Sequence, residues 1–191
     1  RSTGSSPIMP TADPAVQVFR QDGMWVRRVG EHCFPDPDYD PSADPEWEKW
    51  TGRAAKYLRD AEDYWFHVYK PRAGDVIIDI GAGRGEDTYA FSKAAGAEGR
   101  VWAVEAHPVT YRALELFCRL NGLENVQPVH MAAVDEAAEL QVETLPVWES
   151  NYVRAGAPAP QSHPVQGRRF DDFAAEQGIG RIDFIKMNIE G

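Results

Sequence analysis

The sequence has few of the features that would place the protein outside the cell, in a membrane or on a nucleic acid. Its 191 residues contain only two cysteines, Cys33 and Cys118, too few and too far apart for a disulfide framework or a cysteine zinc site. No apolar run approaches the roughly 18 residues of a membrane span, and no charged-then-apolar start indicates a signal peptide. Basic residues are scarce, since 20 Lys and Arg against 30 Asp and Glu give a net charge of −10. We therefore expect a cytoplasmic protein without a membrane or nucleic-acid partner, although the charge suits a cationic ligand.

The composition is that of a folded domain, with 43% hydrophobic and 26% charged residues. Residues 1–10 resemble the remnant of a tag and are left out of the fold argument. Residues 11–73 are expected to form an N-terminal arm and helix. Trp25–Val29 is its one predicted strand, a proline-rich stretch follows as a wrapping arm, and a helix is predicted from about Glu46 to Phe66.

From Gly74 onward, strands and helices alternate. Near-continuous apolar runs, typical of strands covered on both faces, predict strands at Val76–Ile80, Arg100–Val104, Val126–Val129 and Ile182–Ile189. Helical periodicity predicts helices at Thr88–Ala95, His107–Leu120 and Phe170–Gln177. This alternation predicts right-handed crossovers and an α/β fold with a doubly wound, mostly parallel sheet.

Two parts of residues 74–191 depart from this alternation. Leu140–Leu145 alternates enough to be an edge strand, and residues 150–165 have the composition of a mobile surface loop. The sequence stops directly after the fourth strand, which such a sheet would place in its centre. An open apolar edge is unfavourable, so we expect this domain to lack its C-terminal strands.

A glycine-rich loop follows the first buried strand, with Gly81, Gly83 and Gly85 in the sequence DIGAGRGE. Glycines there allow a tight turn and a close approach to a ligand. The dinucleotide fingerprint needs a third glycine at position 86, where Glu86 stands instead. Carboxylates at both ends, Asp79 and Glu86, would repel a pyrophosphate and suit S-adenosylmethionine, which carries a sulfonium and an ammonium. The alternative is a structural turn with solvated acids.

Glu105 ends the second predicted strand. A carboxylate at this position can accept hydrogen bonds from both hydroxyls of a ribose, at the switch point where open α/β sheets bind nucleosides. S-adenosylmethionine and NAD would both use it, so Glu105 indicates a nucleoside without choosing between them. The alternative is an ordinary surface glutamate.

Five segments together resemble the FkbM-type S-adenosylmethionine-dependent methyltransferases, a Rossmann-like family: DVIIDIGAGRGEDT, WAVEAHP, LNGLENV, RRFDDF and IDFIKMNIEG. The resemblance covers roughly Gly74 to Gly191. It implies that the loop binds the methionine moiety, Glu105 the ribose, and residues near the end of the third strand the adenine. The candidate cofactor-binding residues are Asp79, Gly81, Ala82, Gly83, Gly85, Glu105, Ala106, Met131, Ala132 and Asn188. Asn188 stands where the family usually has aspartate, so it keeps hydrogen bonding and loses the charge.

Two residues are candidate general bases for methyl transfer to an alcohol. His130 ends the third strand and could be such a base, although the sequence favours a hydrogen-bonded structural histidine. Glu190 shares a strand face with Asn188 and so would point toward the same cleft. No metal site is predicted.

The first hypothesis is therefore an S-adenosylmethionine-dependent methyltransferase with a small-molecule acceptor. The resemblance, rather than any single residue, implies O-methylation of a sugar or secondary-metabolite hydroxyl. Two alternatives stay open: a nicotinamide-dependent oxidoreductase, and a non-catalytic methyltransferase-like binding module, which the loss of charge at Asn188 would favour.

Overall fold

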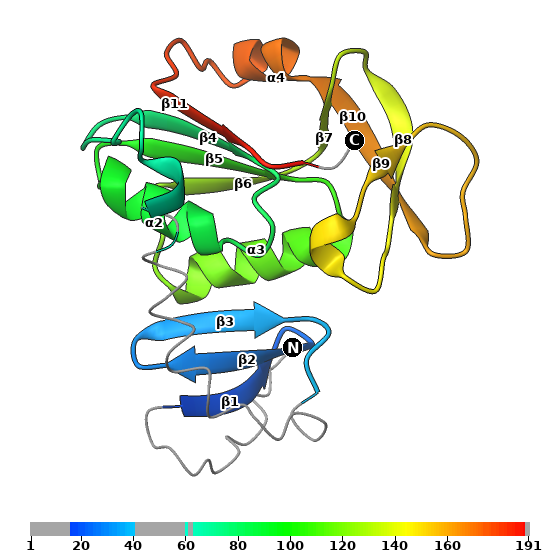
Figure 1. Cartoon of the computed structure of the whole chain (residues 1–191), viewed down its shortest axis with the longest axis horizontal. Helices are drawn as coiled ribbons and strands as arrows, with labels where there is room; N and C mark the ends of the chain where they lie inside the picture. Colours follow the sequence, from blue (N-terminus) through cyan, green and yellow to red (C-terminus); the bar gives the residue numbers. More distant parts are fainter. Residues whose placement is uncertain (1–15, 41–59, 61–62, 190–191) are drawn as a thin grey trace.

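The computed structural model describes residues 16–40, 60 and 63–189, and these form three sheets. A parallel sheet stands in the centre, an antiparallel N-terminal sheet lies below it in Figure 1, and a mixed sheet lies beside its carboxyl edge. Within the described residues, no helix has the length and apolar character needed to cross a membrane.

The central sheet confirms the predicted fold class. Its strand order is β11-β4-β5-β6, all parallel, with bounds β4 Val76–Ile80, β5 Arg100–Glu105, β6 Val126–His130 and β11 Phe184–Met187. Helices α2 (Glu86–Ala95) and α3 (Pro108–Leu120) cover one face and α4 (Phe170–Glu176) covers the other (Figure 1). The order reverses between β4 and β11, so the ligand-binding switch point of a doubly wound sheet lies at their carboxyl ends.

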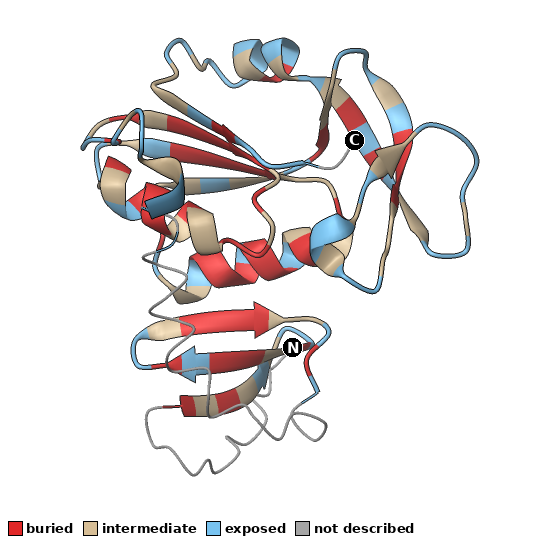
Figure 2. Cartoon of the chain, in the orientation of Figure 1, coloured by how far each residue is buried: buried red, intermediate tan, exposed pale blue. Residues whose placement is uncertain are grey.

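Strand β4 is buried because helices cover both of its faces (Figure 2). Ile77 packs with Phe91 of α2 on one side, and Ile78 packs with Trp102 and Phe173 on the other. This double burial explains the continuous apolar run of its sequence. By contrast, β11 is shorter than predicted and is an edge among the described strands.

The mixed sheet has the order β7-β10-β8-β9, with bounds β7 Ala132–Val134, β8 Ala138–Glu143, β9 Val153–Arg154 and β10 Ser162–Arg169. The prediction of β8 as an edge strand is wrong, because β10 and β9 flank it. The predicted loop 150–165 is also interrupted by β9 and by the start of β10. Pro164 is tolerated in β10 because β7 pairs only with Gly167–Arg169, which leaves one side of the strand open at the proline.

Residues 16–36, which were expected to contribute one strand, form a three-stranded sheet. Strands β1 (Val16–Gln21), β2 (Met24–Val29) and β3 (His32–Asp36) form an antiparallel meander that packs on α3. The predicted strand Trp25–Val29 is confirmed as β2. The start of the predicted arm is instead the end of β3, because Pro35 lies on the outer strand, where a missing N–H is tolerated. Residues 37–40 form neither strand nor helix, and the rest of the predicted arm lies outside the described residues. Most of the predicted helix 46–66 lies outside the described residues. Of the part that is described, residues 60 and 63–65 are helical.

Candidate functional site

The glycine loop turns the chain from β4 into α2 at the switch point. The N–H groups of Gly81 and Ala82 both donate to the Val104 carbonyl at 3.0 Å, which holds the loop against β5. Gly81 has a φ of 74°, and a Cβ added there would lie 2.1 Å from the carbonyl oxygen of Asn188. Glycine is therefore required where the loop passes the end of β11.

The other two loop glycines serve different contacts. Gly83 has a φ of 58°, and a Cβ there would lie 3.1 Å from the Trp148 ring. At Gly85, a Cβ would lie 2.6 Å from the Phe117 ring of α3. Gly83 therefore keeps space beside Trp148, whereas Gly85 permits the close packing of two helices.

Glu105 lies at the carboxyl end of β5, and two backbone groups hold its carboxylate. One oxygen accepts the Gly83 N–H at 3.0 Å and the other accepts the His107 N–H at 2.8 Å. Burial raises the pKa of Glu105 to about 7, although both backbone bonds and the charge of Lys186 act to lower it. Each oxygen retains a lone pair, so the carboxylate can accept further hydrogen bonds from hydroxyl donors.

His107 caps helix α3, accepting from the Thr110 N–H at 3.4 Å, and bonds the Thr144 hydroxyl at 2.8 Å. Burial and the neighbouring His163 lower the pKa of His107 to about 4. The imidazole is therefore neutral near pH 7 and is a weak base.

Lys186 of β11 sits beneath the glycine loop and compensates the acids around it. Its ammonium lies 2.9 Å from Asp79 Oδ1 and 3.6 Å from Asp87 Oδ2, and it donates to the Gly81 carbonyl at 2.7 Å. Asp79 is fully buried and also accepts from the Thr88 hydroxyl at 2.6 Å. Burial alone would lower the pKa of Lys186, but the two carboxylates raise it above its usual value.

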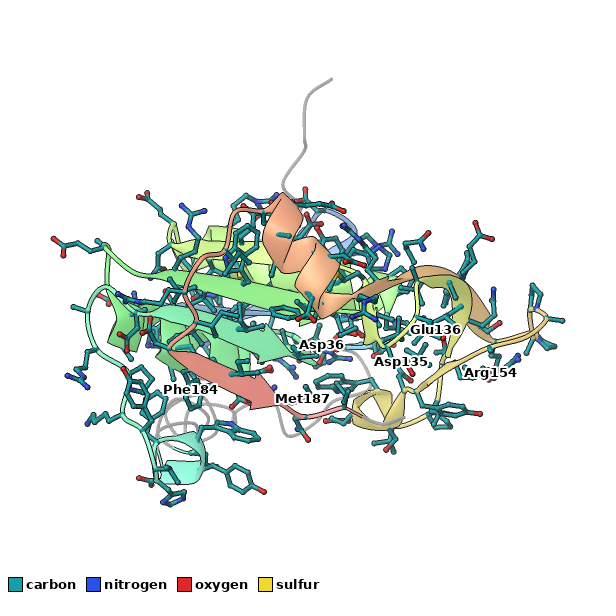
Figure 3. The ribbon with its side chains drawn as sticks, turned by 90° about the horizontal axis from the view of Figure 1, so that it is seen from above. Asp36, Asp135, Glu136, Arg154, Phe184 and Met187 are labelled. Carbon is teal, nitrogen blue, oxygen red and sulfur yellow. The ribbon has the colours of Figure 1, made fainter. Side chains whose placement is uncertain are left out.

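Two neighbouring cavities open at this edge. The loop cavity, of about 290 Å³, is bounded by the glycine loop, Glu105, Lys186 and the residues after β11. The sheet cavity, of about 850 Å³, lies between the end of β3, the start of α3 and the segment after β8. Both are lined by Glu86, Trp148, Glu149 and Asn151, which form their shared wall. In Figure 3 β11 ends at Met187, on the side that carries the mixed sheet with Glu136 and Arg154.

Comparison with known families now identifies the fold's relatives. The profile of the methyltransferase FkbM domain matches residues 79–191, more than half of the chain and all of the described site from Asp79 onward. The chain belongs to the FkbM methyltransferase family. S-adenosylmethionine is therefore its cofactor.

Three individual relatives each share less than a third of their residues with this chain in the aligned regions. The chain is 31% identical over 150 residues to the catalytic subunit TRM61 of tRNA (adenine(58)-N(1))-methyltransferase from Yarrowia lipolytica, covering 69% of this chain and 38% of that protein. Among solved structures, it is similar to precorrin-6y C5,15-methyltransferase from Geobacter metallireducens, with 21% identity, a TM-score of 0.34 and coverage of 44% and 40% of the two chains. Fibrillarin from Aeropyrum pernix, solved with bound S-adenosylmethionine, gives 18% identity, a TM-score of 0.34 and coverage of 70% and 65%.

The loop cavity of this FkbM domain fits a nucleoside that carries positive charge. Its described lining includes four carboxylates, Glu86, Asp87, Glu105 and Glu149, and one ammonium, Lys186. Lys186 is already paired with acids, so this lining offers no free cation to a diphosphate. The carboxylate of Glu105 can accept hydrogen bonds from the hydroxyls of a ribose, and the neighbouring loop glycines have no Cβ atom to prevent its close approach.

Six of the ten candidate cofactor residues come together in this cavity: Gly81, Ala82, Gly83, Glu105, Ala106 and Asn188. The structure does not bring the other four into it. Asp79 is sealed beneath the loop by Lys186, and Gly85 packs on α3. Met131 and Ala132 are 1% and 4% exposed and belong to the hydrophobic core, because β7 returns the chain there into the mixed sheet.

Of the two candidate bases, only His130 lies within the described residues, and it is away from the shared wall. His130 is exposed, stacks on Tyr111 and bonds the Ala106 carbonyl at 3.0 Å, and it lines neither cavity. Its alternative interpretation, a hydrogen-bonded structural histidine, describes it better. Glu190 lies outside the described residues.

Lys186 and Trp148 line the loop cavity but were not predicted as site residues from the sequence. The lysine had a signal, because a charge inside a buried strand next to a buried Asp79 implies an ion pair. Trp148 had none, since it stands in the short helix η2 (Trp148–Ser150) within a segment of loop composition.

Proposed function

We propose that the protein is an S-adenosylmethionine-dependent methyltransferase that binds the cofactor in the loop cavity and a small hydroxylated acceptor in the sheet cavity. The shared wall of the two cavities carries this proposal. When bound, S-adenosylmethionine supplies a methyl group on a sulfonium, whose C–S bond breaks as the acceptor oxygen attacks the carbon. Alignment of the reacting groups can contribute about 7–11 kcal/mol. It requires that the methyl and the acceptor oxygen meet, and the four residues common to both linings support this because they place the two cavities next to each other.

Glu86 is the residue best placed to take the acceptor's proton. It begins α2, lines both cavities, and burial raises its pKa above the usual value for a glutamate. A raised pKa makes a carboxylate a stronger base. His107 also lines the sheet cavity, but its lowered pKa makes it a weaker base.

A hydroxyl acceptor agrees with the polar lining of the sheet cavity. Carboxylates and the side chains of His163, Thr144 and Asn151 can all bond hydroxyl groups. The relative from Yarrowia lipolytica is named for a tRNA substrate. The acidic lining opposes the phosphates of RNA, which favours a small molecule over a nucleic acid.

Calorimetry with S-adenosylhomocysteine, followed by transfer of labelled methyl from S-adenosylmethionine, tests the proposal. We expect saturable binding, and labelling of one or more members of a panel of sugars and hydroxylated metabolites. Absence of binding at millimolar ligand refutes the cofactor site. Binding without turnover on any acceptor supports the non-catalytic module, and labelling of a tRNA transcript alone refutes the small-molecule acceptor.

A further inference from the structure

The N-terminal sheet builds one wall of the sheet cavity. The end of β3 and the residues after it, from Phe34 to Asp40, line this cavity together with Arg27 of β2. All of these residues precede the segment that matches the FkbM domain. A part of the chain outside the family match therefore shapes the space beside the cofactor cavity.

Acidic groups outnumber basic ones around this cavity. Its described lining has five carboxylates, Asp36, Asp38, Asp40, Glu86 and Glu149, and two guanidinium groups, Arg27 and Arg84. With the histidines neutral, the formal charge of the lining is −3. Both arginines are already committed to carboxylates. The excess of negative charge favours a cationic occupant and disfavours a phosphorylated one.

Arg84 provides a second, independent feature. It lies in the glycine loop, and its guanidinium bonds Asp36 at 2.7 Å, also pairs with Asp38, and stacks 4.4 Å from the centre of the Trp148 ring. Its side chain is only 9% exposed, and its Nε–H is buried without a hydrogen-bond partner among the described residues. A buried donor without a partner is costly. Because this N–H has almost no accessible surface, a ligand oxygen can accept it only when the Arg84 side chain shifts, and that contact would then be favoured.

From these features we propose that the sheet cavity is the acceptor site and that the acceptor is a polyhydroxylated amine, such as an amino sugar. The ammonium lies among the carboxylates of the cavity, and a hydroxyl or ring oxygen accepts from Arg84 Nε. The acceptor hydroxyl then faces the wall shared with the loop cavity. This assignment rests on the proposed methyltransferase function.

A series of sugars that differ in charge tests the assignment. The probes are glucosamine, its neutral N-acetyl derivative and a glucose phosphate, each titrated into the full chain by NMR in the presence of saturating S-adenosylhomocysteine. We expect glucosamine to bind most tightly, to shift the Trp148 indole signal, and to lose its preference as the salt rises from about 0.05 M to about 0.5 M, because salt screens the charges. Equal affinities, or tighter binding of the phosphate, overturn the assignment.

Matched variants locate the site. Glu149→Gln removes one carboxylate that lines the cavity, on an exposed position, and we expect about two- to fivefold weaker binding of glucosamine with little change for the N-acetyl sugar. Glu136→Gln makes the same change on an exposed turn that lines neither cavity and should change neither affinity. If the two variants weaken glucosamine binding equally, the affinity depends on the net charge of the protein and not on this cavity, and the assignment is overturned.

Failure of this assignment is distinguishable from failure of the proposed function. If S-adenosylhomocysteine binds but no sugar binds at a concentration of about 10 mM, the acceptor assignment fails and the methyltransferase proposal stands. If S-adenosylhomocysteine itself does not bind, the methyltransferase proposal fails first.

Discussion

Replacing Glu105 with glutamine tests the ribose site through its proton rather than through activity. Glutamine keeps the size of the side chain and one carbonyl oxygen, but it cannot ionise and places an NH2 group toward one of the two backbone N–H groups, of Gly83 and His107, that the carboxylate accepts. The variant therefore removes both the charge and one acceptor at the ribose position.

The magnitude follows from the pKa of Glu105, which burial raises to about 7. At pH 6 the carboxyl is about nine-tenths protonated, and ribose hydroxyls that donate to it stabilise only the ionised form. Ligand binding then has to release a proton, which weakens the affinity by about tenfold, or about 1.4 kcal/mol, relative to pH 8. The affinity should rise as the pH rises from 6 to 8, because the carboxyl of Glu105 is mostly ionised, and so able to accept the ribose hydroxyls without releasing a proton, only above its raised pKa.

Calorimetric titration with S-adenosylhomocysteine measures both quantities. In buffers of different ionisation enthalpy, the native protein should release close to one proton per ligand at pH 6 and almost none at pH 8. Glu105→Gln should bind about 10- to 100-fold more weakly at pH 8, as expected for the loss of a hydrogen bond to a charged group of about 1.5–3 kcal/mol.

The variant is also the control for other groups. Burial raises the pKa values of Glu86 and Asp87 as well, and both remain in the variant. A proton release that persists unchanged in Glu105→Gln would assign it to these residues. Affinity that does not vary with pH in the native protein would refute the ribose role of Glu105.

Three further predictions concern the same edge of the sheet. Gly83→Val should abolish S-adenosylhomocysteine binding in calorimetry, because a Cβ at this φ of 58° would press on Trp148, and unchanged affinity would mean that the loop is only structural. Lys186→Met should lower the free energy of unfolding by about 3–5 kcal/mol in denaturant titration, because it leaves the Asp79 carboxylate buried without its ammonium partner. Adding Asp79→Asn to that variant should recover part of the loss. No recovery would indicate a simple packing defect instead. Glu86→Gln should lower kcat by about 10²- to 10⁴-fold in the methyl-transfer assay, a larger effect than on the affinity for S-adenosylhomocysteine, although Glu86 also lines the loop cavity. A loss confined to that affinity would make Glu86 a cofactor ligand rather than a base.

The strands and helices of the central sheet were predictable because their signals are local. The apolar run of β4 and the stop signals after each helix need no knowledge of distant contacts. Strand β1 and strand β3 were missed although Asp22-Gly23, with φ values of 49° and 83°, is a recognisable hairpin turn. The prolines after it outweighed that signal, and only the position of β3 at the edge of its sheet makes Pro35 acceptable.

The residues that line the loop cavity could be proposed from the sequence where they stand next to strand ends. Gly81, Gly83 and Glu105 are adjacent to strand ends, and the strand order brings them together. The adenine contacts at Met131 and Ala132 were placed by resemblance alone, and the return of the chain through β7 buries both residues. Contacts such as that of Trp148 depend on how a second sheet packs against the first, which no local pattern encodes.

Arg84 shows how the two cavities are connected through one residue of the loop. Its neighbours on both sides, Gly83 and Gly85, have positive φ values. They allow the backbone to turn so that the guanidinium lies beside Asp36 rather than in the loop cavity. A movement of the loop would therefore be transmitted to the wall of the sheet cavity, because the guanidinium of Arg84 is paired with Asp36 and Asp38 and stacks on Trp148. If acceptor binding depends on this connection, Arg84→Met should reduce the effect of S-adenosylhomocysteine on sugar affinity while the loop itself still binds the cofactor. By linkage, the sugar should then also lose its effect on cofactor affinity by the same factor.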